Sequence, residues 1–234
     1  EVFLVVGQGF QSMSSWASCE DLSAAEREAT AIAEALAPMG LGLRVEPEGG
    51  ELSTKEMMRY GAVVYHNGGW GDPMLTPTTE GFQELHNEGQ GLLFLGDDLG
   101  YLVEITRDLT GSDWLGALVG VEAYEANITY DNELVIADTG HDFVDGPSGT
   151  VSSFEYQADL DALVLVERSD LSVALEGAQQ GSPAAWSISG TAESGSVGVI
   201  GSSIYNSHDC PIADENGLDQ LEKLLQNAIA WIKN

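Results

Sequence analysis

A chain of 234 residues with 43% hydrophobic residues is long enough for one large domain or two small ones, and it is globular rather than disordered. Its 38 acidic residues against 8 basic ones give a formal net charge of −30, which argues against nucleic acid and anionic membranes as partners. No apolar run reaches the roughly 20 residues of a membrane span, so we expect no membrane insertion.

The acidic residues are spread along the chain and not gathered in a tail. This favours simple solubility, or an environment rich in salt or divalent cations, over a basic partner. Because few acids can be paired, we expect stability to fall at low ionic strength. Residue 1 directly precedes a strand-like run, which is compatible with a processed or trimmed piece of a longer precursor.

The first part of the chain alternates between buried strands and amphipathic helices. Strands are predicted at 2–6, 41–46, 61–69 and 91–96. Helices are predicted at 22–36 and 76–87, and a short helix between them is predicted to be capped by Ser53 and Glu56. Ser23 and Glu26 form the capping box of the first helix. The pattern predicts an α/β fold with a flavodoxin-like parallel sheet of about five or six strands and helices on both faces.

The middle of the chain has a different pattern. Short alternating strands separated by Gly, Asp and Ser turns predict an antiparallel β-rich insertion at about 118–190. A buried strand at 195–203 and an amphipathic helix from Leu218 to Ile232 follow. His141-Asp142 and Asp145-Gly146-Pro147 are typical of turns.

Right-handed crossovers place the carboxyl ends of the parallel strands at one edge of the sheet, where ligands bind in such folds. Three loops converge there: 7–9, 66–70 and 96–98. The ligand-binding residues predicted in these loops are Gln8, Asn67, Gly68, Gly69, Trp70 and Asp97. Trp70 is either a platform for stacking sugars or a packing residue.

The stretch "LLFLGDDLG" at 92–100 has the spacing of a nucleophile elbow, with Asp98 between Gly96 and Gly100. Asp98 is either a nucleophile, or a metal ligand or other ligand contact at the start of the following helix, or, as we favour, a cap of that helix. His66 is either a base or metal ligand at the end of its strand, or a hydrogen-bonded histidine that shapes the glycine turn, and we favour the second interpretation.

The order of these elements resembles the class I glutamine amidotransferase-like superfamily, most closely its trehalose-utilisation (ThuA-like) branch. The resembling stretches are "AVVYHNGGW", "NEGQGLLFLGDDLGYL", "GHDFVDGPSGTV" and "GSVGVIGSSIYN…LLQNAIAWI". The resemblance covers nearly the whole chain and implies a single domain, 1–234.

The departures from that family concern its chemistry. Asp98 stands at the position of the nucleophilic Cys, and His208-Asp209 stands one residue too tightly where a His-x-Glu would be. A carboxylate cannot replace the thiolate in glutamine hydrolysis, so glutamine amidotransferase activity is rejected.

Two further sites are predicted in the loops at this edge. Asp209, Asp214 and Asn216 offer oxygen ligands for calcium, and no other cofactor is predicted. Cys19 and Cys210 lie in loops that the fold brings to the same edge, so a disulfide is predicted. With the acidic surface it favours an extracytoplasmic location, secreted or at the cell surface.

Three functions remain open, and the sequence leans away from an enzyme. The first is a non-catalytic structural or binding module whose partners are other protein subunits, copies of itself included, or a carbohydrate ligand. The second is a hydrolase, with carbohydrate as a candidate substrate, that uses Asp98, His66 and His208. The third is a subunit of an extracellular assembly stabilised by divalent cations.

Overall fold

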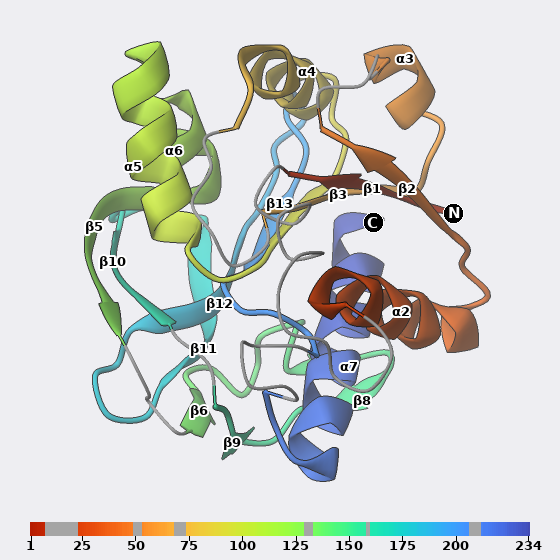
Figure 1. Ribbon diagram of the computed structural model, residues 1–234, viewed down its shortest axis with the longest axis vertical. Helices are drawn as coiled ribbons and strands as arrows, with labels where there is room; N and C mark the ends of the chain where they lie inside the picture. Colours follow the sequence, from red (N-terminus) through yellow and green to blue (C-terminus); the bar gives the residue numbers. More distant parts are fainter. Residues whose placement is uncertain (8–22, 49–52, 68–73, 129–132, 158–159, 206–211) are drawn as a thin grey trace.

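The computed structural model describes residues 1–7, 23–48, 53–67, 74–128, 133–157, 160–205 and 212–234. A nine-stranded sheet in the order β2-β1-β3-β4-β13-β12-β11-β6-β9 runs through this part of the chain (Figure 1). Its strands are β1 (Val2–Val6), β2 (Leu43–Pro47), β3 (Ala62–His66), β4 (Leu92–Leu95), β6 (Glu133–Ile136), β9 (Phe154–Glu155), β11 (Leu171–Gly177), β12 (Pro183–Ile188) and β13 (Val197–Ile200).

The sheet has a parallel half and an antiparallel half. The strands from β2 to β13 pair in parallel, in the strand order of flavodoxin-like folds, which confirms the predicted fold class. From β13 to β9 every pairing is antiparallel. Four strands of the predicted insertion, β12, β11, β6 and β9, therefore extend the parallel sheet.

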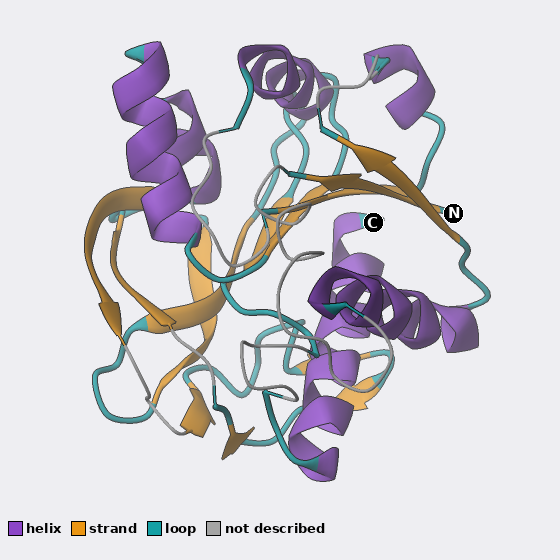
Figure 2. Cartoon of the chain, in the orientation of Figure 1, coloured by secondary structure: helices purple, strands orange, loops and turns teal. Residues whose placement is uncertain are grey.

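Helices cover both faces of the sheet (Figure 2). They are α2 (Ala24–Leu36), the short 3₁₀ helix η2 (Ala37–Met39), α3 (Thr54–Met57), α4 (Thr76–Asn87), α5 (Leu99–Thr110), α6 (Trp114–Val119) and α7 (Glu215–Ile232). Val2, Leu4 and Val6 of β1 point into the core under α2 and α7, whereas Phe3 and Val5 point into the core under α3 to α6. This alternation is the two-residue period of a strand buried on both sides.

Capping agrees with the sequence at one helix and differs at another. The Ser23 side chain accepts a hydrogen bond from Glu26 N, and Ser23 N donates to Glu26 Oε2 at 2.8 Å, which confirms the capping box. Ser53 precedes α3 but its side chain makes no capping hydrogen bond, so that part of the prediction is wrong.

The insertion is less regular than predicted. Within 145–157, inside the predicted insertion, the strands are very short: β9 and the hairpin formed by β7 (Asp145–Gly146) and β8 (Gly149–Thr150). β5 (Val121–Ile128) and β10 (Leu160–Leu165) pair with each other apart from the main sheet and lie against α5. The helix α6 was not predicted.

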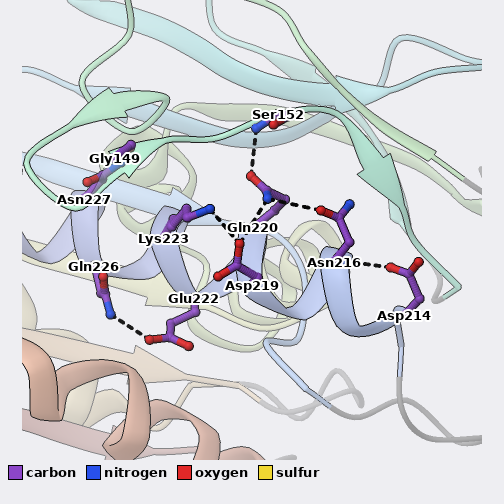
Figure 3. Close-up of polar contacts among 11 residues, drawn as sticks. Gly149, Ser152, Asp214, Asn216, Asp219, Gln220, Glu222, Lys223, Gln226 and Asn227 are labelled. Carbon is purple, nitrogen blue, oxygen red and sulfur yellow. Dashed lines mark hydrogen bonds and ion pairs between the residues drawn. The ribbon is translucent and has the colours of Figure 1, made fainter.

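The last helix fastens the insertion to the parallel half (Figure 3). The fully buried Asn227 donates from Nδ2 to Phe143 O and Gly149 O, and its Oδ1 accepts from Ser148 N at 2.9 Å. Gln220 Oε1 accepts from Ser152 N at 2.9 Å. The predicted apolar stripe of α7 is therefore joined by buried amides that bind the backbone of the turn-rich segment.

His141, in the predicted turn, forms hydrogen bonds to its own turn and to neighbouring strands. Its Nδ1 accepts from Phe143 N at 3.0 Å, which assigns the ring proton to Nε2, and Nε2 lies 2.9 Å from Ser187 Oγ and 3.2 Å from Ser172 O. The imidazole thereby ties the turn to β11 and β12 as a neutral ring, and burial lowers its pKa.

Candidate functional site

The carboxyl ends of the parallel strands carry the polar residues that the sequence singled out. β3 ends at His66 and is followed by Asn67, β4 is followed by Gly96, Asp97 and Asp98, and β13 is followed by Ser202 and Ser203. Because β4 lies between β3 and β13 in the sheet, its aspartates lie between the two other groups.

His66 is paired with a carboxylate that the sequence analysis missed. Its Nε2 lies 3.2 Å from Glu28 Oε1, and neither side chain has any exposed surface. Glu28 also accepts hydrogen bonds from the backbone, from Ile204 N at 2.5 Å and from Tyr205 N at 2.8 Å. Glu28 therefore connects α2, the end of β3 and the chain after β13.

A signal for Glu28 exists in the sequence. It lies three residues after Ala25 and four before Ile32, on the stripe of α2 that faces the core, and all three are buried. A carboxylate on the apolar face of a helix needs a buried partner. His66 is the last residue of β3, inside the predicted strand, and its predicted hydrogen-bonded state is confirmed. The glycines that follow it lie outside the described residues.

Asp98 keeps the backbone of an elbow but does not cap the helix. It is the one described non-glycine residue with positive φ, at φ 54° and ψ 25°, directly before α5. Its side chain makes no capping hydrogen bond, so the favoured interpretation of Asp98 as a cap is wrong.

The cap comes from the insertion instead. Asp161, on β10, is buried, and its Oδ2 accepts a hydrogen bond from Gly100 N at 2.6 Å. A Cβ on Gly100 would lie 2.2 Å from Leu163 Cδ2 and 3.0 Å from Asp161 Oδ2, so the close approach of β10 favours a glycine at the second position of the elbow spacing. Gly96, with φ 116°, is required by its backbone conformation.

A third buried carboxylate at this edge also binds backbone. Glu48, just beyond β2, accepts from Leu75 N at 2.8 Å and from the Tyr65 hydroxyl at 3.2 Å. A Cβ on Gly7 would lie 2.4 Å from Tyr65 Oη, which explains a glycine directly after β1. Glu28, Glu48 and Asp161 therefore share one role, because each accepts a main-chain N–H at the carboxyl edge.

The remaining polar residues form a buried group around Asp97. Asn67 Nδ2 donates to Asp97 O at 2.6 Å. Burial raises the pKa of the Tyr156 hydroxyl well above its usual value, and the Asp97 carboxylate raises it further, whereas nearby Ser202 lowers it. The approach of Ser202 to that hydroxyl does not have the geometry of a hydrogen bond.

Several predicted site residues fall outside the described residues. They are Gln8, Gly68, Gly69, Trp70, His208, Asp209, Cys19 and Cys210. The convergence of His208 with Asp98 and His66, and the disulfide, stay predictions. Of the predicted residues in the described part, His66, Asn67, Asp97 and Asp98 lie at the same edge.

The predicted calcium ligands have other contacts in the structure. Asp214 is the N-cap of α7 and accepts from Gly217 N at 2.8 Å, and Asn216 Oδ1 accepts from Gln220 Nε2 at 3.5 Å (Figure 3). Among the described residues, no three His, Cys, Asp or Glu side chains form a group that could hold a metal ion. The third ligand, Asp209, lies outside them, so calcium binding stays a prediction.

The comparisons with known proteins identify the fold. No protein-family profile matches the sequence, and no curated protein matches it. A ThuA-like protein from Bacteroides uniformis superposes with a TM-score of 0.65 at 12% identity and covers 99% of this chain and 90% of its own. A ThuA-like protein from Parabacteroides merdae gives 0.58 at 10% identity, covering 100% and 90%.

The same architecture occurs inside longer proteins. A β-galactosidase from Bacillus circulans superposes with a TM-score of 0.58 at 14% identity, and the match covers 97% of this chain but only 30% of the enzyme. At these identities the likeness concerns the fold alone. The chain has the α/β fold of ThuA-like proteins, with extra antiparallel strands, in agreement with the sequence analysis.

Proposed function

We propose that this protein is a non-catalytic structural or binding module with an amidotransferase-like fold, acting outside the cytoplasm. One observation carries the proposal: at the edge where such folds place their chemistry, the buried carboxylates and His66 bind the protein's own chain. His66 has no exposed surface and faces Glu28, which is itself held by two backbone amides. A base enclosed in this way has no path to a substrate proton.

The residue at the elbow supports the same proposal. Asp98 occupies the place of the thiol nucleophile, and the amide of Gly100 is already bonded to Asp161. The buried Asp161 carboxylate thus places a negative charge at the start of α5, beside the elbow, which disfavours an oxyanion there. This fold matches less than a third of a longer enzyme, which supports the proposal that it can serve as one module of a larger protein.

The partners proposed for the module are other protein subunits, further copies of this chain, or a carbohydrate. The scarcity of basic residues and the formal charge of −30 argue against polyanions as partners. Within the described residues no helix is both long and apolar enough to span a bilayer.

A hydrolase is the second candidate, and the positive φ of Asp98 favours it. Residues held in the left-handed region concentrate at functional sites, and the elbow spacing is complete on both sides of Asp98. Tyr101 and Tyr124, paired edge to face at 5.9 Å beside this turn, would present aromatic faces to a sugar.

The two candidates are separated by a rate measurement on the purified chain. Wild type, Asp98→Asn and the matched variant Asp108→Asn are assayed against aryl glycosides and aryl esters. Asp108 is exposed on the helix that follows Asp98, and its substitution removes the same charge. The proposed module hydrolyses none of them faster than buffer. Turnover that Asp98→Asn abolishes and Asp108→Asn retains would establish the hydrolase instead.

A further inference from the structure

Four buried polar atoms at the carboxyl edge lack a hydrogen-bond partner. They are Asn67 Oδ1, Tyr156 Oη, Ser202 Oγ and Ser203 Oγ. All four residues are between 0% and 1% exposed. Native proteins bond nearly all such atoms to protein groups or to ordered water or ions in the interior. A group of unpartnered oxygens at one edge therefore indicates an occupant.

These residues, which we call the edge cluster, come from separate segments that meet. Asn67 follows β3 and holds Asp97 O, which follows the neighbouring strand β4. Ser202 and Ser203 follow β13, on the other side of β4. Tyr156 lies close enough to Ser202, Ser203 and Asp97 for each to act on its hydroxyl.

The oxygen atoms of the edge cluster favour a positively charged occupant. Asn67 uses its Nδ2 to donate to Asp97 O, so the atom left over is an acceptor. Hydroxyl groups can turn their hydrogens away and present lone pairs. The carboxylates of Asp97 and Glu28 both raise the pKa of Tyr156, so the local potential is negative. A cation suits this surrounding and an anion does not.

The mostly neutral oxygens of the edge cluster favour a monovalent over a divalent cation. Ca²⁺ and Mg²⁺ sites are built on carboxylates, and the described residues contain no group of three acidic or other metal-binding side chains. The edge cluster instead offers amide and hydroxyl oxygens beside one carboxylate. Rings of neutral oxygens replace the hydration shell of K⁺ in selective sites.

We propose that the edge cluster binds a dehydrated monovalent metal cation, Na⁺ or K⁺, through Asn67 Oδ1 and the hydroxyls of Tyr156, Ser202 and Ser203. The bound ion would join the ends of β3, β4 and β13 and offset the negative charge of Asp97. The site does not depend on the proposed non-catalytic function, because a hydrolase with the same fold would hold the ion equally well.

Thermal unfolding in matched salts tests the proposal. The melting temperature is measured in NaCl, KCl and N-methyl-D-glucamine chloride at one ionic strength of about 0.3 M, where surface screening is the same in all three. Binding of Na⁺ or K⁺ to the native state alone raises the melting temperature by about 4 °C or more over the organic cation. Equal melting temperatures in the three salts would overturn the proposal.

Two variants locate the effect. Tyr156→Phe removes a hydroxyl of the edge cluster, and Tyr101→Phe removes one from a partly exposed tyrosine on α5 as the matched control. Tyr156→Phe should abolish most of the difference between metal and organic cation, whereas Tyr101→Phe should keep it. An unchanged difference in Tyr156→Phe would place the ion elsewhere and contradict the assignment.

A crystal grown with Tl⁺ or Rb⁺ in place of Na⁺ and K⁺ gives a readout that needs no variant. Anomalous scattering should show a peak within coordination distance of Ser202 Oγ and Asn67 Oδ1. Ordered water alone at that point, without an anomalous signal, would overturn the proposal.

Discussion

Asp161 Oδ2 accepts a hydrogen bond from Gly100 N at 2.6 Å, across 61 positions of sequence. The start of α5 is therefore capped by the β-rich insertion, and Asp98, the residue next to the helix in sequence, does not cap it. This relationship couples the insertion to the elbow. Asp161 and Asp98 should therefore contribute differently to the stability of the fold.

Substitutions at these two aspartates should have unequal effects. Asp161→Ala leaves a buried amide without its charged acceptor and should lower the free energy of unfolding by about 2 kcal/mol. Asp98→Gly removes a side chain from a left-handed residue and should be neutral or stabilising by up to about 1 kcal/mol. Urea unfolding of both variants measures the difference. A larger loss in Asp98→Gly than in Asp161→Ala would restore Asp98 as the cap.

Helices and strands whose ends are marked by neighbouring residues could be predicted from the sequence. β1 and α4 have the predicted bounds, because a continuous apolar run and a Pro at the first helical turn mark them. Glu28 was within reach of the same reasoning, since its position on the buried stripe of α2 is visible in the sequence. Asp161 was not, because its partner is fixed only by the way β10 packs against α5.

Acid should weaken the fold through His141. Burial lowers its pKa in the native state below the value of about 6.5 in an unfolded chain. Below about pH 6.5 the unfolded state therefore binds more protons, and stability falls as the pH falls. His141→Asn, whose Oδ1 can still accept from Phe143 N, should lose stability less steeply between about pH 7.5 and pH 5.5.

Denaturant unfolding at both pH values measures the two slopes. Both proteins carry the same carboxylates, so the difference between their slopes reports His141. His86, whose pKa is also lowered by burial, remains in both and contributes equally. Identical slopes in wild type and His141→Asn would show that the imidazole is not kept neutral by the fold.

Salt should stabilise the protein in the absence of any binding. With 38 acidic and 8 basic residues, self-repulsion opposes the compact state at low ionic strength. Raising N-methyl-D-glucamine chloride from about 0.01 M to 0.3 M shortens the screening length from about 30 Å to less than 10 Å and should raise the melting temperature. A melting temperature independent of this salt would contradict the expectation of self-repulsion. It would not bear on the difference in melting temperature between metal salts and this organic salt.

Cys19 and Cys210 should be joined in the protein isolated under oxidising conditions. Such a bond would close a very long loop and add a few kcal/mol to stability by chain entropy. Peptide mapping by mass spectrometry without reductant should recover a cross-linked pair that reductant separates. Two alkylated thiols in the native protein would remove the disulfide, and with it the main support for an extracytoplasmic location.

The central claim is that His66 is enclosed and structural, and its chemical reactivity tests this most directly. Diethyl pyrocarbonate modifies accessible neutral imidazoles, and residue-resolved mass spectrometry gives a rate for each histidine in the native and the urea-unfolded chain. His66, without exposed surface and facing Glu28, should react far more slowly in the native protein than in the unfolded chain, and more slowly than the half-buried His86. A native rate for His66 close to its unfolded rate would contradict the account and return His66 to the list of residues that can meet a substrate.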